Sequence, residues 1–301
     1  MTKNQSIVYF DNNSVKEKTI NNLNSIPEFL DEKFLLKKTQ KFLLKKLGLL
    51  ENEYWNKFRT DILKHMKANS YVVIKDLPFD DNNRLVVGLS CFIGTPLSQF
   101  NKKILKMVHE ITPRTGPEYD ENFPHTDGVY WPEPNDVLAL QCVRKDQNNG
   151  GLSRIVPINS AIEKLKSEGN VDVIKKLTKS KFPFTLDPRY GKSGMHLQHI
   201  LTREKFSDSF YDYVRFLRAD IEYCIKEFHV NLEKTTIDAV KTFENELIKI
   251  GKKMEFQVKE GDWLLVDNKR ALHSRSPTSP NSTRTLRRIK FNLDRKKVFV
   301  N

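Results

Sequence analysis

The sequence predicts an α+β fold, and two observations support this. Apolar residues recur at helical spacing near the start of the chain and again between about 161 and 250, whereas strand-like runs flank that second helical region. This order lacks the regular alternation of strand and helix that builds a parallel sheet. At 301 residues, the chain is also long enough to bury a sizeable core without disulfides.

The helical regions are marked by apolar residues three or four positions apart. They cover residues 26–67 with an interruption near Gly48, and then 84–92, 161–177, 206–228 and 235–250. Residues 1–25 are polar and rich in Asn, so we expect a loosely held lead-in there. We expect a single domain over 26–301.

The strand predictions follow from short runs of β-branched and aromatic residues. These runs are 71–74, 137–143, 154–157, 254–258, 263–267 and 286–293. A polar turn over 146–151 separates the second run from the third. Four Pro or Gly residues between 113 and 124 indicate a loop, which we expect to act as a lid over a site.

The chain is strongly basic. Lys and Arg number 51 against 38 Asp and Glu, which gives a formal net charge of +13. Lysine pairs such as Lys37-Lys38 and Lys252-Lys253 lie far apart and are mixed with acidic residues, whereas a nucleic-acid footprint concentrates on one helix or arm. We therefore favour a solvated basic surface and no nucleic-acid partner. A basic nucleic-acid-binding protein is the alternative of a different class.

Cysteine usage and the absence of long apolar segments bear on the compartment. Cys91, Cys142 and Cys224 are odd in number and lack CxxC spacing, which is typical of buried thiols in a reducing compartment. The first twenty residues contain no continuous apolar stretch, and no later stretch is long enough for a membrane span. We expect a cytoplasmic protein with no membrane partner and leave the oligomeric state open.

Three residues in two segments could hold a metal ion. His125 and Asp127 project from the same face of an extended segment, although such a pair is unspecific alone because acidic residues are common. His273 follows a turn at Gly261-Asp262 and an apolar strand. Two imidazoles and one carboxylate would form a facial triad, which leaves three positions of an octahedral metal open and suits non-haem Fe(II).

Zinc is the alternative metal. A closed structural zinc site would require four ligands, preferably thiolates, and the cysteines are not spaced for one. The same triad could hold catalytic zinc and activate water, so a zinc hydrolase stays open. Such an enzyme would work without dioxygen.

A basic cluster begins eleven residues after His273. In a strand, Arg284, Leu286 and Arg288 share one face, so two guanidinium groups would point inward beside the metal. Buried arginine requires an anion, and a dicarboxylate cosubstrate would supply one in bidentate geometry. The alternative is a basic edge strand that faces water.

These motifs together resemble the Fe(II)/2-oxoglutarate-dependent dioxygenases of the TauD/TfdA superfamily, which are clavaminate synthase-like. The matching features are His125-Thr126-Asp127, the Gly150-Gly151-Leu152-Ser153 turn, the stretch from Gly261-Asp262 to His273, and Arg284-x-Leu286-x-Arg288. They occur in the order of the family and cover the chain from about Tyr71 to Leu293. Four motifs in register are far more specific than any one of them.

The resemblance implies roles for individual residues. His125, Asp127 and His273 would ligate iron, and Arg284 would bind the distal carboxylate of 2-oxoglutarate. Ser153 matches the hydroxyl position that helps to hold the same cosubstrate. Arg288 would lie near the cosubstrate or the substrate. With O2 as co-reactant, this implies oxidative decarboxylation of 2-oxoglutarate coupled to hydroxylation or desaturation, because the carboxylate of Asp127 separates the chain from the halogenating branch.

The resemblance also implies a fold. The family has a double-stranded β-helix, a jelly-roll or cupin-like core, with flanking helices and a helical insert over the mouth of the active site. The helical patterns fall where that insert belongs, at about 158–253.

Substrate predictions rest on residues next to the metal-binding pattern. Asn122 could offer an amide, Tyr130 or Trp131 could pack on the substrate, and Arg288 could bind it. We expect a small, amino-acid-derived substrate. The stretch from His125 to Tyr130 also resembles the branch that oxidises amino-acid-derived isonitriles, so oxidative decarboxylation or desaturation of an isonitrile is the alternative.

Overall fold

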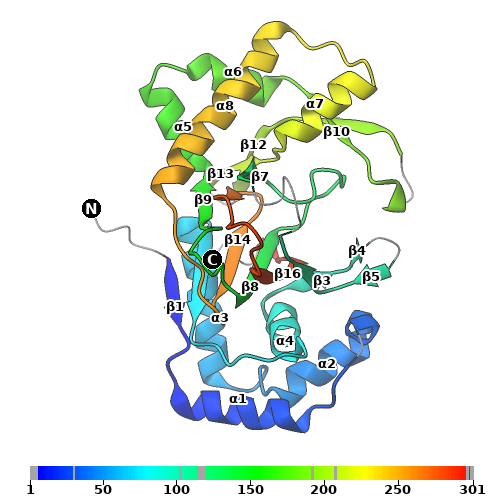
Figure 1. Cartoon of the computed structure of the whole chain (residues 1–301), viewed down its shortest axis with the longest axis vertical. Helices are drawn as coiled ribbons and strands as arrows, with labels where there is room; N and C mark the ends of the chain where they lie inside the picture. Colours follow the sequence, from blue (N-terminus) through cyan, green and yellow to red (C-terminus); the bar gives the residue numbers. More distant parts are fainter. Residues whose placement is uncertain are drawn as a thin grey trace.

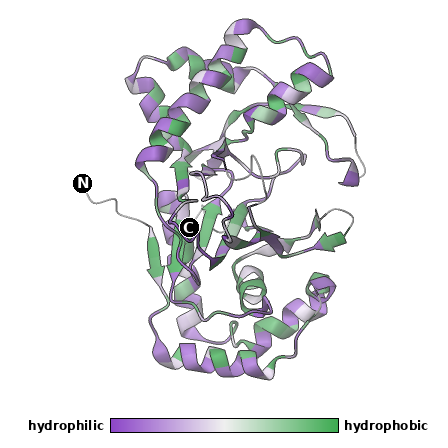
Figure 2. Cartoon of the chain, viewed as in Figure 1, coloured by the Kyte–Doolittle hydropathy of each residue, from purple (hydrophilic) through white to green (hydrophobic). Residues whose placement is uncertain are grey.

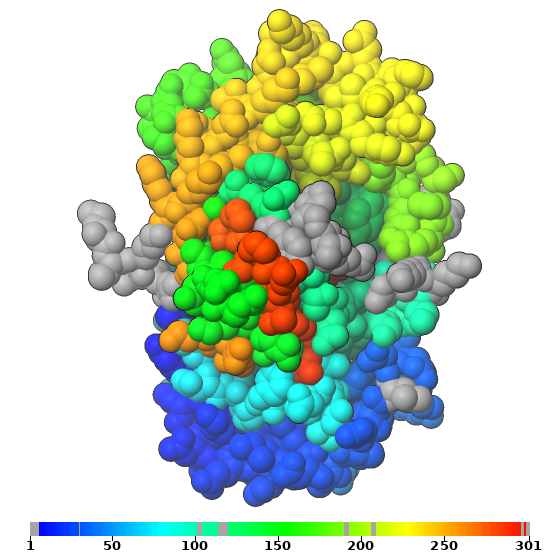
Figure 3. Space-filling model, in the orientation of Figure 1, coloured from blue at the N-terminus to red at the C-terminus, as the bar shows by residue number. Residues whose placement is uncertain are grey.

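The computed structural model describes residues 6–29, 31–101, 104–113, 120–190, 193–206, 209–295 and 298. Three parts follow one another along the long axis (Figure 1). N-terminal helices form one end, β-sheets the middle, and residues between 158 and 253 the other end. Figure 3 shows the same division, with blue and cyan segments at one end and yellow and orange segments at the other.

A seven-stranded sheet dominates the middle part. Its order is β1 (Ile7–Tyr9), β2 (Tyr71–Lys75), β14 (Trp263–Asp267), β8 (Val137–Arg144), β16 (Thr285–Asn292) and β3 (Thr95–Leu97), with β6 (His109–Ile111) also paired to β16. Only the β1/β2 pair is parallel among these described strands. The four strands predicted around 71–74, 137–143, 263–267 and 286–293 are confirmed. Their adjacency brings distant segments of the chain together.

A smaller sheet carries the residues that matter most for the site. Its order is β7 (Asn122–His125), β15 (Ala271–Arg275) and β9 (Ser153–Pro157), all antiparallel. The strand predicted over 254–258 is reduced to one bridge between Phe256 and Ser153. The two sheets are the structural basis of the mixed α+β class.

N-terminal helices cover one side of the large sheet. They are α1 (Asn13–Ser25), η1 (Asp31–Leu35), α2 (Lys37–Lys46), α3 (Glu53–Asn69) and α4 (Arg84–Ile93). α3 and α4 contact strands of the sheet, α2 packs on α4, and Trp55 of α3 is almost fully buried. Figure 2 shows green, hydrophobic strands in the middle and mixed colours on the outer helices.

Residues 6–25 of the segment expected as a loosely held lead-in contain β1 and α1, and residues 1–5 lie outside the described residues. Asn12 caps α1 by accepting a hydrogen bond from the backbone N–H of Val15. Val8, Phe10 and Leu23 join the main core. A few apolar side chains at the right spacing are enough to pack a polar segment onto the core. The high Asn content of the segment made these side chains easy to overlook in the sequence.

The region between 158 and 253, expected as a helical insert, contains four β-strands as well as helices in its described residues. Its elements are α5 (Ile158–Ser167), α6 (Val171–Lys179), β10 (Phe182–Thr185), η3 (Pro188–Tyr190), β11 (Met195–Gln198), β12 (Leu201–Phe206), β13 (Ser209–Val214), α7 (Arg218–Glu227) and α8 (Lys234–Lys253). The helix predicted over 206–228 begins only at Arg218. The preceding residues pair as a hairpin, β12/β13, and the aromatic residues Phe210, Tyr211 and Tyr213 of β13 favour a strand.

This region has its own core, in which Phe243 of α8 packs edge-to-face on Phe216. A short hairpin, β4 (Gln99–Asn101) with β5 (Ile104–Lys106), projects beside the large sheet (Figure 1). Within the described ranges, none of the helices is both long and apolar enough to cross a membrane.

Candidate active site

The structure brings together the three residues that the sequence predicts as metal ligands. His125 ends β7 and lies directly opposite His273 of β15, with ring centroids 4.2 Å apart. Asp127 follows two residues after β7, and its Oδ1 lies 3.7 Å from Nε2 of each histidine. One ligand atom from each residue lies within 4.8 Å of the others. Antiparallel pairing of β7 with β15 produces this arrangement, although the two strands are far apart in sequence.

A buried amide holds the loop that carries Asp127. The side chain of Asn268 accepts a hydrogen bond from the backbone N–H of Asp127 at 2.7 Å and donates one to its carbonyl at 2.9 Å. Gly128 then has a positive φ of +75°, and a Cβ there would lie 3.1 Å from the ring of Trp131. The sequence analysis did not predict a role for Asn268. Its position at the turn that follows a buried strand could have indicated one.

The protonation states suit a metal. The Nδ1–H of His125 donates to the carbonyl of Phe123 at 2.8 Å, which leaves the Nε2 lone pair for a ligand. Burial lowers the pKa of His273 to about 3, so this imidazole is neutral. Burial opposes ionisation of Asp127, but Lys290 and Arg288 outweigh it and hold its pKa well below the usual range.

This donor set fits a divalent transition metal. Metal ligands must be deprotonated imidazole nitrogens and carboxylates, and His273 and Asp127 have that state at neutral pH. Two nitrogens and one oxygen on one side of a metal leave the other positions open, which suits non-haem iron better than structural zinc. The described residues contain no thiolate in this cluster.

Of the predicted arginines, Arg288 contacts the cluster, and Arg284 lines the same cavity as Arg288. Arg284 precedes β16 and is 7% exposed, and burial lowers its pKa to about 10. No carboxylate forms an ion pair with it among the described residues. Gly151 makes room for this side chain, since a Cβ there would lie 2.8 Å from Cδ of Arg284. Arg284 is therefore a buried guanidinium placed to receive an anion.

Arg288 connects the metal-binding cluster to the cavity. Its Nη1 donates to Oδ2 of Asp127 at 3.3 Å, and its buried Nε has no hydrogen-bond partner. The alternative of a basic edge strand facing water is wrong, because β16 lies between β8 and the strands β3 and β6. The inward face predicted for Arg284 and Arg288 is confirmed, since both line one cavity.

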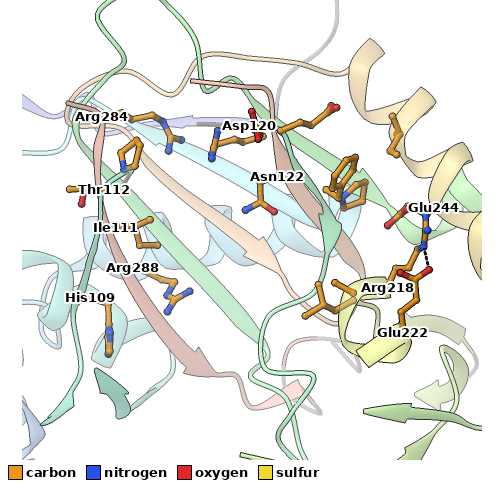
Figure 4. Close-up of a pocket in the computed structure, with 18 of the residues that line it drawn as sticks. His109, Ile111, Thr112, Asp120, Asn122, Arg218, Glu222, Glu244, Arg284 and Arg288 are labelled. Carbon is orange, nitrogen blue, oxygen red and sulfur yellow. Dashed lines mark hydrogen bonds and ion pairs between the residues drawn. The ribbon is translucent and has the colours of Figure 1, made fainter. Parts of the chain in front are cut away.

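The cavity has a volume of about 1140 Å³ and lies between the sheets and the region 158–253. Figure 4 shows Arg284 and Arg288 on one side, Arg218, Glu222 and Glu244 on the other, and Asn122 between them. Arg218 donates to Glu222 at 2.8 Å and to Glu244 at 2.6 Å, so α7 and α8 present a cross-linked polar wall.

The metal-binding cluster lies at the edge of this cavity. The three ligand candidates do not line it themselves, but their neighbours Pro124 and Arg288 do. Residues 114–119 of the loop expected as a lid over 113–124 lie outside the described residues. Its described end contributes Asp120 and Asn122 to the wall.

Three other predicted site residues lie elsewhere. Ser153 is 6% exposed, pairs through its backbone with Phe256, and is not among the lining residues. Tyr130 and Trp131 pack against each other at 5.6 Å between ring centroids and are also not lining residues. Their rings instead lie near Nζ of Lys290, at 5.9 and 4.8 Å.

Sequence reasoning missed Lys290 and His109. Lys290 is fully buried on β16, with Nζ 3.1 Å from Oδ2 of Asp127. Lys290 is two residues after Arg288 and therefore lies on the same face of the strand, so the strand pattern could have predicted its position. His109 of β6 lies opposite Arg288 and lines the cavity. Burial lowers its pKa. Its three-residue strand was too short to recognise.

Comparisons with known proteins agree with this geometry. The pattern of the family described as "Taurine catabolism dioxygenase TauD, TfdA family" matches residues 54–290. A comparison with curated protein sequences gives no significant match.

Similar solved structures are non-haem iron oxygenases. A structure of asparagine oxygenase (AsnO) has a TM-score of 0.73 and 16% identity, covering 96% of this chain and 93% of that one. The oxygenase OrfP with Fe and alpha-ketoglutaric acid has a TM-score of 0.68 and 15% identity, with 97% and 95% covered. OrfP with Fe and L-Arg has a TM-score of 0.65 and 15% identity, with 97% and 95% covered. These likenesses show a common fold, and because the family pattern covers more than half of the chain, the protein belongs to the TauD/TfdA family of dioxygenases.

Proposed function

We propose that this protein is an Fe(II)- and 2-oxoglutarate-dependent dioxygenase that hydroxylates or desaturates a small, amino-acid-derived substrate. The observation that carries the proposal is a cluster of three metal-binding side chains that Arg288 connects to a cavity lined by the buried guanidinium of Arg284. A buried arginine without an anion costs free energy, so Arg284 implies an anionic ligand. Together they form a site for a metal and a dicarboxylate.

Each residue has a distinct role in this proposal. His125, Asp127 and His273 hold Fe(II), and Arg284 binds the distal carboxylate of 2-oxoglutarate through two N–H donors. Ser153 is proposed as a hydroxyl contact to the same cosubstrate. When bound, iron and 2-oxoglutarate would supply oxidising chemistry that side chains lack. The walls of the cavity orient the substrate and limit the access of water.

The substrate class follows from the polar groups of the cavity. Arg288 has an unused Nε beside the metal-binding cluster, so it can donate to the carboxylate of an amino acid. Asn122 lines the same cavity and can hydrogen-bond a second polar group. Similar structures contain 3-hydroxyasparagine with succinate in asparagine oxygenase and L-Arg in OrfP. These ligands support an amino acid as the reacting molecule.

The fold supports the same proposal. We infer that the seven-stranded sheet and the sheet β7-β15-β9 correspond to the two sheets of a double-stranded β-helix. Residues 26–301 would form one domain, with the region of about 158–253 as the insert that closes the site.

The proposal is tested by mixing purified protein with Fe(II) and 2-oxoglutarate without oxygen. A visible charge-transfer band from the chelated keto acid is expected. Folded protein that shows no band would refute the proposal. Amino acids and their isonitrile derivatives are then screened for succinate formation in air, which separates the hydroxylase from the isonitrile alternative. A salt titration with generic duplex DNA tests the nucleic-acid alternative, for which affinity would fall steeply with salt.

A further inference from the structure

Lys290 is an unusual residue for the centre of a sheet. Its side chain is completely buried on β16, between the partner residues Leu138 of β8 and Leu97 of β3. Lysine is almost never fully buried unless it is paired. The ion pair of Nζ with Oδ2 of Asp127, at 3.1 Å, supplies the pairing.

Little else around Lys290 compensates its charge. Nζ makes no well-aligned hydrogen bond among the described residues, and its other close neighbours are the rings of Trp131 and Tyr130. A hydrophobic residue of similar volume would avoid the cost of burying an ammonium group. Packing alone therefore does not account for a lysine at this position.

The two carboxylate oxygens of Asp127 have different surroundings. Oδ2 faces two cations, Lys290 at 3.1 Å and Arg288 at 3.3 Å. Oδ1 faces Nε2 of His125 and of His273, each at 3.7 Å. One oxygen is thus occupied by cations, and the other is directed toward the position that a metal would take.

We propose that Lys290 is a positioning residue that holds Oδ2 of Asp127, restricts this carboxylate to ligation through Oδ1, and so preserves the open metal positions that 2-oxoglutarate needs. This inference rests on the proposed function. Because Lys290 secures Oδ2 from the buried side, Arg288 does not have to do so alone. Arg288 can then donate hydrogen bonds to an anionic group of a substrate in the cavity.

The test uses Co(II) in place of Fe(II). The visible absorption of Co(II) reports the number and geometry of its ligands, and the measurement can be made in air. Lys290→Met removes the ammonium group and keeps the length of the side chain. Without Lys290, Oδ2 is free to chelate the metal, and 2-oxoglutarate must compete with it. We expect a changed Co(II) spectrum and a Kd for 2-oxoglutarate about tenfold higher, measured by titration of the Co(II) bands.

Lys75→Met is the matched control. Lys75 also pairs with a buried carboxylate, that of Asp262 at 3.6 Å, and lies on β2 of the same sheet, away from the metal-binding cluster. We expect this control to retain the wild-type Co(II) spectrum and 2-oxoglutarate affinity. A Lys290→Met protein that matches the control in both measurements would overturn the inference.

A second measurement needs no variant. In crystals of the wild-type protein with Co(II), Oδ1 alone should ligate the metal while Nζ of Lys290 stays on Oδ2. Ligation through both oxygens, or a displaced Lys290, would refute the positioning role. If wild-type protein fails to bind Co(II) at all, the proposed function fails instead, so the two failures are distinguishable.

Discussion

Replacement of Arg284 by methionine should weaken 2-oxoglutarate binding while it stabilises the protein. Arg284 is 7% exposed and has no ion-pair partner among the described residues. Two charge-assisted hydrogen bonds to one carboxylate are worth about 3 kcal/mol or more. At about 1.4 kcal/mol for each factor of ten, the Kd for 2-oxoglutarate should rise by at least ~100-fold.

The stability should change in the opposite direction. Burial lowers the pKa of Arg284 to about 10, so the folded protein disfavours the charged form that is present at neutral pH. Removal of this charge should raise the free energy of unfolding by about 1–3 kcal/mol. This gain in stability should be present throughout the range below pH 10, where Arg284 of the wild-type protein is protonated in both the folded and the unfolded state.

Arg295→Met provides the matched comparison. Arg295 is similarly buried, but it donates to Asp136 at 2.7 Å and to Asp267 at 2.5 Å. Loss of a partner from a buried ion pair should destabilise the protein by about 3–5 kcal/mol. Urea denaturation gives both stabilities, and isothermal titration with 2-oxoglutarate and Co(II) gives the Kd. If Arg284→Met binds 2-oxoglutarate as tightly as wild type, the role assigned to Arg284 is wrong.

Three further substitutions test the framework of the site. Asp127→Ala should raise the Kd for Co(II) more than ~100-fold by titration, whereas Asp120→Ala in the cavity wall should not; equal affinities would exclude Asp127 as a ligand. Asn268→Ala removes hydrogen bonds to both backbone groups of Asp127, so urea denaturation should show a loss of about 1–3 kcal/mol. Burial opposes ionisation of Asp146, but hydrogen bonds from Ser279 outweigh it and lower its pKa. Its stabilisation should be present above about pH 4 and decline below it, and Asp146→Asn should flatten that part of the curve of stability against pH; an unchanged curve would contradict this.

Local patterns were sufficient to identify the chemistry of the site. His125 and Asp127 are only two residues apart, so their ligand atoms can reach one metal ion, although Asp127 lies in the turn after β7 and not within the strand. Arg284 and Arg288 were predicted from strand alternation, and both line the cavity although Arg284 precedes β16. Strands such as β14 were predictable because their apolar residues form a continuous run, as expected where both faces are covered.

Patterns failed where a segment takes its structure from distant partners. Residues 201–214 have a composition that suits either helix or hairpin, and pairing of β12 with β13 decides between them. Phe10 belongs to a polar segment, yet it stacks on Trp55 at 5.0 Å and is thereby held in the core. Single-residue composition carries no information about such contacts.

The sequence by itself determined which side chains could bind a metal and a dicarboxylate, because those properties belong to residue types and to their spacing along short segments of the chain. Only the tertiary structure decided that His273 lies opposite His125, that Lys290 occupies one oxygen of Asp127, and that α7 and α8 close the cavity. These contacts join residues far apart in the chain. They depend on strand register and packing, which are set by the whole fold.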